Sequence, residues 1–190
     1  DLPRHKNVLV NTHATFRWRH GLFAAFDFDQ LKSFAADFYL TLLDNAENVH
    51  QRLLREHDLD HTLKDIMVWR EEELLATEIV ANIARGYGHF FMVSRGRNVL
   101  TTQTFYRLLF EPGRKKVYPS FPMSHVMDLP KTLGEIEQFR ATIREHFITF
   151  DPADVDELLL HTAAVQAMAE GRTTIEVQAA DGPITLKTTD

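Results

Sequence analysis

Residues 37–56 read DFYLTLLDNAENVHQRLLRE, and this one stretch contains the pattern of both a strand and a helix. Its first seven residues are mostly aromatic and apolar side chains that pack well on a pleated surface, so residues 37–43 are predicted to form a strand. Asp44 and Glu47 have the spacing of a capping box, and Val49 and Leu53 repeat at helical spacing. The stretch therefore predicts a strand followed by a helix over about residues 45–56.

The same alternation continues on both sides of this stretch. Strands are predicted at residues 8–11, 89–94 and 147–150, and helices at 26–34, 61–84, 101–110, 131–146 and 151–170. Strands that alternate with helices are typical of a parallel sheet. We therefore predict an α/β fold with an open, mainly parallel sheet and flanking helices. The break at Pro112-Gly113 divides it into two consecutive units, residues 1–112 and 113–190.

The two ends of the chain carry patterns that a larger sheet would continue. The apolar segment Val8-Leu9-Val10 lies close to the first residue, and a buried strand usually needs neighbours on both sides. At the other end, residues 173–177 and 184–186 flank Asp181-Gly182, which predicts a hairpin. We expect the chain to be truncated at both ends. The alternative is that these segments are edge strands of a complete small domain.

Composition excludes several classes of protein. The 190 residues include no cysteine, which excludes disulfides, thiolate zinc sites and a cysteine nucleophile. Acidic residues outnumber basic ones by 27 to 21, so the formal charge of −6 argues against general affinity for nucleic acid. No apolar run approaches the roughly 20 residues of a membrane helix, and no secretion leader is visible. We expect a cytoplasmic protein without a membrane partner, and a homo-oligomer stays open.

A first candidate site is the polar cluster after the predicted strand at residues 8–11. Side chains at the carboxyl end of such a strand are well placed to meet a ligand in an open α/β sheet. Hydroxyls, an imidazole and two cations in this place could orient a phosphate. His13 could equally be a hydrogen-bonded polar residue at a strand end. The candidates are Thr12, His13, Thr15, Arg17 and Arg19.

A second candidate is a set of cations on the two helices that follow. Arg52 and Arg55 are three residues apart on one predicted helix, and Lys64 and Arg70 lie on the next. Guanidinium groups at such spacing can hold phosphate oxygens in bidentate pairs. The alternative is a solvated face on which Arg52 pairs with Glu56 four residues on and Arg70 pairs with Glu73 three residues on.

Other motifs count against specific chemistries. The segment His57-Asp58-Leu59-Asp60-His61 has two histidines four residues apart, but it falls in the connection between two predicted helices and completes no zinc signature, so no metal is predicted. The sequence contains neither the Gly-x-x-x-x-Gly-Lys-Ser/Thr loop that holds phosphates nor a Gly-x-Ser-x-Gly nucleophile elbow.

Residues 8–93 nevertheless resemble archaeal-type adenylate kinases, which are nucleoside monophosphate kinase-like P-loop proteins. The similarity rests on Val8–Thr15, on Gly21-Leu22-Phe23, and on the arginine-rich segment Arg52–Leu59 with the helix after it. The phosphate loop of that family is absent, and His57 stands where arginine is usual. The resemblance implies phosphoryl transfer with ATP and Mg²⁺. With the patterns above, it gives catalytic roles to His13, Arg52 and Arg55, cofactor contacts to Arg70 and Lys64, and substrate contacts to Thr12, Thr15, Arg17 and Arg19.

Residues 115–156 are similar to the opening of nucleoside 2-deoxyribosyltransferase-like domains. The similarity rests on Val117–Pro122, on Glu137–Arg140 and on the strand Phe147–Phe150 with Asp151-Pro152 after it. It implies a Rossmann-type unit, incomplete here because the family's catalytic glutamate would follow residue 190. Ser120 stands where glycine is commoner in that family.

Together these similarities predict a nucleotide-processing protein that joins an ATP-dependent kinase-like unit to a deoxyribosyltransferase-like unit. Its partner would be a nucleotide or nucleoside. Without the phosphate loop, this chain alone is expected to be inactive. The alternative is a nucleotide-binding or sensor module that catalyses nothing.

Overall fold

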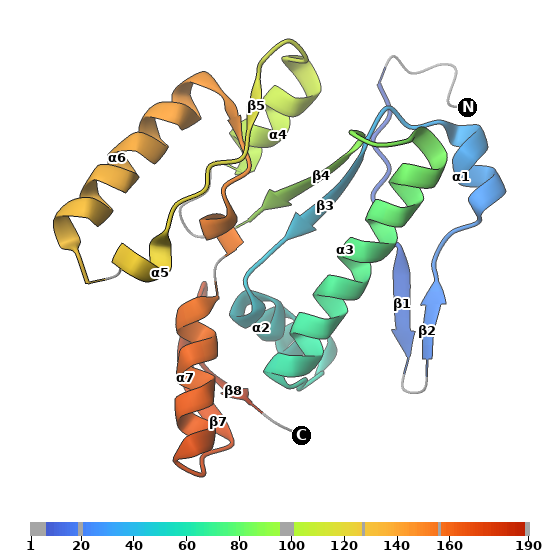
Figure 1. The fold of residues 1–190 in the computed structure, drawn as a ribbon. Coiled ribbons are helices and arrows are strands. Elements are labelled where there is room, and N and C mark those ends of the chain that lie inside the picture. The colour runs from blue at the N-terminus through green and yellow to red at the C-terminus, as the bar shows by residue number, and fades with distance from the viewer. Residues whose placement is uncertain (1–6, 19–20, 96–100, 127, 156, 189–190) are drawn as a thin grey trace. The chain divides into compact units, whose positions relative to one another are not determined.

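A computed structural model of the protein describes residues 7–18, 21–95, 101–126, 128–155 and 157–188 (Figure 1). Within them the chain is mixed α/β, with helices between short strands that pair in twos. Two of these pairs, β1–β2 and β7–β8, are antiparallel hairpins, and the other two, β3–β4 and β5–β6, run parallel. The strands are β1 (Thr15–Trp18), β2 (Gly21–Ala24), β3 (Tyr39–Leu43), β4 (Phe90–Ser94), β5 (Lys116–Val117), β6 (Ile148–Thr149), β7 (Thr174–Ala179) and β8 (Gly182–Lys187).

Most helices form where the periodicity of the sequence predicts them. Asp27 accepts a hydrogen bond from the backbone N–H of Gln30 and so caps the first helix, and the longest helix ends just before Gly86, whose φ of 84° favours glycine. The helices are α1 (Phe28–Phe34), α2 (Ala46–His57), α3 (Leu63–Arg85), α4 (Thr101–Phe110), α5 (Met123–Val126), α6 (Pro130–His146) and α7 (Leu158–Ala169), with a 3₁₀ turn η2 (Pro152–Val155). None of the helices in the described ranges is long and apolar enough to cross a membrane.

The chain forms two compact units, described separately here. The first comprises residues 1–41 and 68–91, and the second residues 42–67 and 92–190. The boundaries fall inside β3, α3 and β4, so these elements contribute residues to both units. This grouping by spatial contact does not test the sequence-based division at residue 112, which stays a prediction.

In the first unit the strand predicted at residues 8–11 is wrong. These residues form no strand, and Val8, Leu9 and Val10 are 43%, 72% and 58% exposed. The polar segment that was expected to be a loop instead begins the β1–β2 hairpin, in which Thr15 lies opposite Ala24. An apolar run forms a buried strand only where a neighbouring strand can hydrogen-bond to its backbone N–H and C=O groups. No described strand pairs with residues 8–11.

The second unit contains a hydrophobic core built from helices packed on the β7–β8 hairpin. The hairpin forms as Asp181-Gly182 predicts, with Ala179 opposite Gly182 at the turn. Its apolar side chains meet those of α2, α7 and the first turn of α3. The buried members are Ala46, Leu63, Ile66, Ala164, Ala167, Ile175 and Leu186.

Two local predictions in this unit are also wrong. The capping box does not form: Asp44 accepts hydrogen bonds from Asn45 and Asn48, while the first N–H of α2, on Ala46, donates to the carboxylate of Glu157 at 2.9 Å. The single helix expected over residues 151–170 is divided into η2 and α7. At the start of α2, a contact between residues far apart in sequence replaces the local one.

The parallel pair β5–β6 positions the site described below. Lys116 lies opposite Ile148 and Val117 opposite Thr149, and the N–H of Phe150 donates to the carbonyl of Val117 at 2.9 Å. Because parallel strands end at the same edge, the segments that follow them, Pro119–Phe121 and Asp151–Ala153, are brought together.

Candidate functional site

The first expected cluster gathers around a glutamate of α3. The N–H groups of Ala14 and Thr15 donate to the two carboxylate oxygens of Glu73 at 2.6 and 2.9 Å, and the Thr15 hydroxyl donates at 2.7 Å. His13 Nδ1 lies 3.7 Å from the same carboxylate, although the His13 side chain is 74% exposed. The structure thus brings His13 and Thr15 together. Their polar groups meet a carboxylate of the chain itself.

The remaining residues expected in this cluster have separate surroundings. Thr12 is exposed, and its hydroxyl donates to the His13 carbonyl. Arg17 pairs with Glu72. Arg70, which belongs to the second candidate set, lies 3.6 Å from Glu71. Arg19 lies outside the described residues. The substrate and cofactor roles of these residues stay predictions.

In the second unit, Arg52 and Arg55 of α2 contact carboxylates in different places. Arg52 Nη1 is 2.6 Å from Asp44 Oδ2, just before the helix begins. Arg55 Nη1 is 2.7 Å from Asp181 Oδ2, in the turn between β7 and β8. Lys64, at the start of α3, is exposed. Both arginines tie α2 to neighbouring segments, and their predicted contact with a transferred phosphoryl group stays a prediction.

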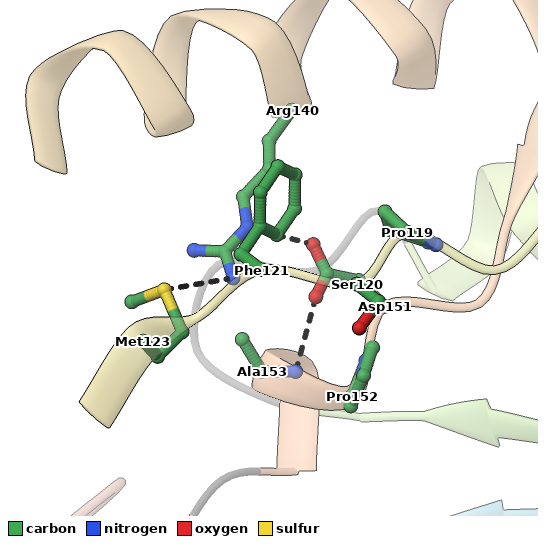
Figure 2. A pocket seen from close by; sticks show the side chains of 8 residues that line it. All are labelled: Pro119, Ser120, Phe121, Met123, Arg140, Asp151, Pro152 and Ala153. Carbon is green, nitrogen blue, oxygen red and sulfur yellow. Dashed lines mark hydrogen bonds and ion pairs between the residues drawn. The ribbon is translucent and has the colours of Figure 1, made fainter. Parts of the chain in front are cut away.

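An open hollow of about 220 Å³ lies where β5 and β6 end (Figure 2). Its walls come from the segment after β5, from α5 and α6, and from the segment after β6. This hollow, called the β5–β6 hollow below, is lined by Pro119, Ser120, Phe121, Met123, Arg140, Asp151, Pro152 and Ala153.

Arg140 of α6 is the charged centre of the hollow, and its side chain is only 6% exposed. Its Nε lies 2.9 Å from Asp151 Oδ2, and its Nη1 donates to Glu137. Its guanidinium carbon lies 4.8 Å from the centre of the Phe121 ring. Figure 2 shows the guanidinium beside this ring, with dashed lines that join it to the Asp151 carboxylate and to the Met123 sulfur. A buried arginine needs such partners because an unpaired buried charge is costly.

Two aspartates on the segment after β6, Asp151 and Asp154, pair with the arginines of α6. Asp151 is 1% exposed and accepts a hydrogen bond from the N–H of Ala153 at 3.0 Å. Arg144, one turn after Arg140, lies 2.6 Å from Asp154 and 3.6 Å from Asp151. Burial raises the pKa of Asp154 to about 6, an effect that Arg144 opposes and the Asp151 charge increases. Carboxyl groups with such raised pKa values cluster at functional sites.

Sequence reasoning assigned no site residue in this hollow. Asp151-Pro152 directly after a predicted parallel strand was a usable signal, since ligands in open α/β sheets bind at the carboxyl ends of strands. Arg140 gave no such signal, because an arginine in the middle of a helix is usually solvated. Only the packing of α6 against residues 120–123 and 151 shows that it is buried.

The described residues offer no ready cluster of side chains for the metal that the kinase resemblance implies. Over the described ranges, no three side chains among histidine, aspartate and glutamate gather in a way that could hold a metal ion. The aspartates and histidines of residues 57–61 are included in that finding. No step through Mg²⁺ or ATP is therefore derived from these residues.

Comparison with known proteins finds no matching family model, no similar curated protein and no similar solved structure.

Proposed function

We propose that this protein binds a nucleoside or nucleotide in the β5–β6 hollow and acts as a binding module. The observation that carries the proposal is the position of the hollow at the carboxyl ends of two parallel strands, with the buried Arg140 and Asp151 in its wall. Ligand sites in α/β proteins form at this edge because the loops after adjacent strands diverge there. Sites of this kind combine apolar walls with a few fixed polar groups.

The lining of the hollow supports a small planar ligand. Phe121, Pro119 and Pro152 supply flat apolar surface, while Arg140, Asp151 and Ser120 supply donors and acceptors. Pockets for drug-sized molecules measure roughly 300–1,000 Å³. At about 220 Å³, the hollow is smaller than such pockets, so a nucleoside would place its ring in the hollow and leave its sugar in solvent.

The proposal includes a fold: an open, mainly parallel sheet in two consecutive units, the second of them Rossmann-like. Two observations support it, namely the parallel pairs β3–β4 and β5–β6. The resemblance of residues 115–156 to deoxyribosyltransferase-like domains agrees with the location of the hollow, because the segments that carry the resemblance line it.

Kinase-like phosphoryl transfer is the second candidate. In its favour, three donors from Ala14 and Thr15 converge on the oxygens of one carboxylate, which is how such groups would hold an anion. Against it, Arg52 and Arg55 are each engaged by an aspartate. This balance favours the binding module.

Isothermal titration calorimetry with a panel of nucleosides and nucleoside monophosphates tests the proposal. We expect saturable binding to the parent chain and loss of binding in Ser120→Leu, whose larger side chain fills the hollow. Ser33→Leu, at an exposed position of α1, is the matched control. Absence of binding across the panel, or unchanged binding in Ser120→Leu, would contradict the proposal. ADP formed from ATP and AMP with magnesium would instead support phosphoryl transfer.

A further inference from the structure

The guanidinium of Arg140 has a weak hydrogen-bond partner at Nη2. Nε lies 2.9 Å from Asp151 Oδ2 as an ion pair without a hydrogen bond, and Nη1 donates to Glu137. Among the described residues, Nη2 donates only to the thioether sulfur of Met123, at 3.8 Å (Figure 2). A thioether is a weak acceptor, and a charged donor forms a much stronger bond to oxygen. An oxygen atom in the hollow would therefore displace Met123 as the acceptor.

The charges around Arg140 determine whether a charged or an uncharged ligand oxygen can accept the hydrogen bond of Nη2. Asp151 and Glu137 both contact the guanidinium, and Asp151 is shared with Arg144, so the positive charge of Arg140 is already paired with carboxylates of the chain. A phosphate or carboxylate placed beside them would meet like charges, and a buried like charge is unfavourable. An uncharged carbonyl oxygen accepts the hydrogen bond of Nη2 without that repulsion.

We propose that the hollow selects ligands whose planar ring carries an uncharged carbonyl, which accepts a hydrogen bond from Arg140 Nη2. The inference rests on the proposed function and adds the chemical class of the ligand. Phe121 holds the guanidinium plane on one side and Asp151 holds Nε, so the donor is fixed before the ligand arrives.

The same arrangement rejects rings that carry an amino group in place of the carbonyl. An amino group would point its hydrogens at Nη2, which is itself a donor, and neither could be satisfied. Specificity of this type comes from the unpaired group in the wrong complex. Inosine, whose base carries a carbonyl, should bind, and adenosine, which carries an amino group in its place and no carbonyl, should bind more weakly.

Competition calorimetry with inosine against adenosine measures this preference. We expect inosine to bind at least about tenfold more tightly, as a hydrogen bond to a charged group allows. Inorganic phosphate should not displace bound inosine. If no nucleoside binds, the proposed function fails. If inosine and adenosine bind equally, or phosphate displaces inosine, only this inference fails.

Two variants at Met123 test the mechanism without removing the buried arginine. Met123→Gln places an amide oxygen where the sulfur lies, so Nη2 gains an internal partner and the oxo-to-amino preference should fall toward one. Met123→Leu removes the sulfur at similar volume and should keep the preference. Thermal unfolding of both variants controls for folding. An unchanged preference in a folded Met123→Gln variant would overturn the inference.

Discussion

Asp151 and Asp154, three residues apart, have different partners. Asp151 faces Arg140 at 2.9 Å and accepts from the Ala153 N–H, whereas Asp154 has Arg144 at 2.6 Å and still has its pKa raised to about 6. Desolvation of the Asp154 carboxyl outweighs the attraction of the arginine. A carboxyl whose pKa is higher in the folded state than in the unfolded state binds its proton more tightly when folded.

The pH dependence of stability follows from that sign. The unfolded pKa of Asp154 is near 3.8, so the folded state binds more protons between about pH 4 and 6, and stability falls as pH rises through this window. Above pH 6, ionisation of the Asp154 carboxyl lowers the free energy of unfolding by about 3 kcal/mol. Asp154→Asn cannot ionise. We therefore expect its free energy of unfolding, measured by urea unfolding, to fall less than that of the parent between pH 4.5 and 7.5. Parallel pH profiles for parent and variant would contradict the shifted pKa.

His50 contributes to the same profile with the opposite sign. Its side chain is 1% exposed, and burial lowers its pKa although Asp60 opposes the shift. The folded state therefore disfavours the charged imidazole, and stability falls as pH drops below about 6.5. The comparison of Asp154→Asn with the parent protein cancels this contribution, because His50 is the same in both.

At the scale of elements, helix ends are held by side chains distant in sequence. The Ala46 N–H at the start of α2 donates to Glu157, next to α7. At the end of α6, Arg107 donates to the carbonyls of Arg144 and Phe147, and Arg114 to that of Glu145. Carboxylates at helix starts and cations at helix ends also complement the helix dipole. These contacts fix how α2 and α6 pack inside the second unit.

Removing the distant cap should destabilise the second unit. We expect Glu157→Ala to lower the free energy of unfolding by about 0.5–2 kcal/mol, the usual range for losing a helix cap. Glu157→Gln keeps an oxygen acceptor and should lose less. Urea unfolding followed by circular dichroism measures both. If Glu157→Ala and Glu157→Gln lower the free energy of unfolding equally, the negative charge of Glu157, rather than the hydrogen bond, explains the effect.

At the scale of the whole molecule, the core of the second unit depends on segments far apart in the chain. Ala46 and Ile66 meet Ala167 and Leu186, which are separated from them by more than one hundred residues in the sequence. Leu186 is fully buried in this core. Stability of the second unit is therefore expected to depend on the β7–β8 hairpin.

Shortening that central side chain tests this dependence. We expect Leu186→Ala to lower the free energy of unfolding by about 2–5 kcal/mol, because it leaves a cavity in the core. Leu42→Ala, at a position that is 53% exposed in the same unit, is the matched control and should lose far less. Equal losses in the two variants would show that Leu186 is not central to the core.

The sequence by itself determined the elements whose signals are local. Periodic apolar residues predicted α2, α3, α4 and α6, and Asp181-Gly182 predicted the last hairpin, because a helix face or a tight turn depends on residues a few positions apart. Tertiary structure decided what depends on partners. It left residues 8–10 exposed, gave the α2 cap to Glu157, and buried Arg140 beside Asp151. Which carboxylate meets which guanidinium is fixed by packing between distant segments, and periodicity carries no information about that.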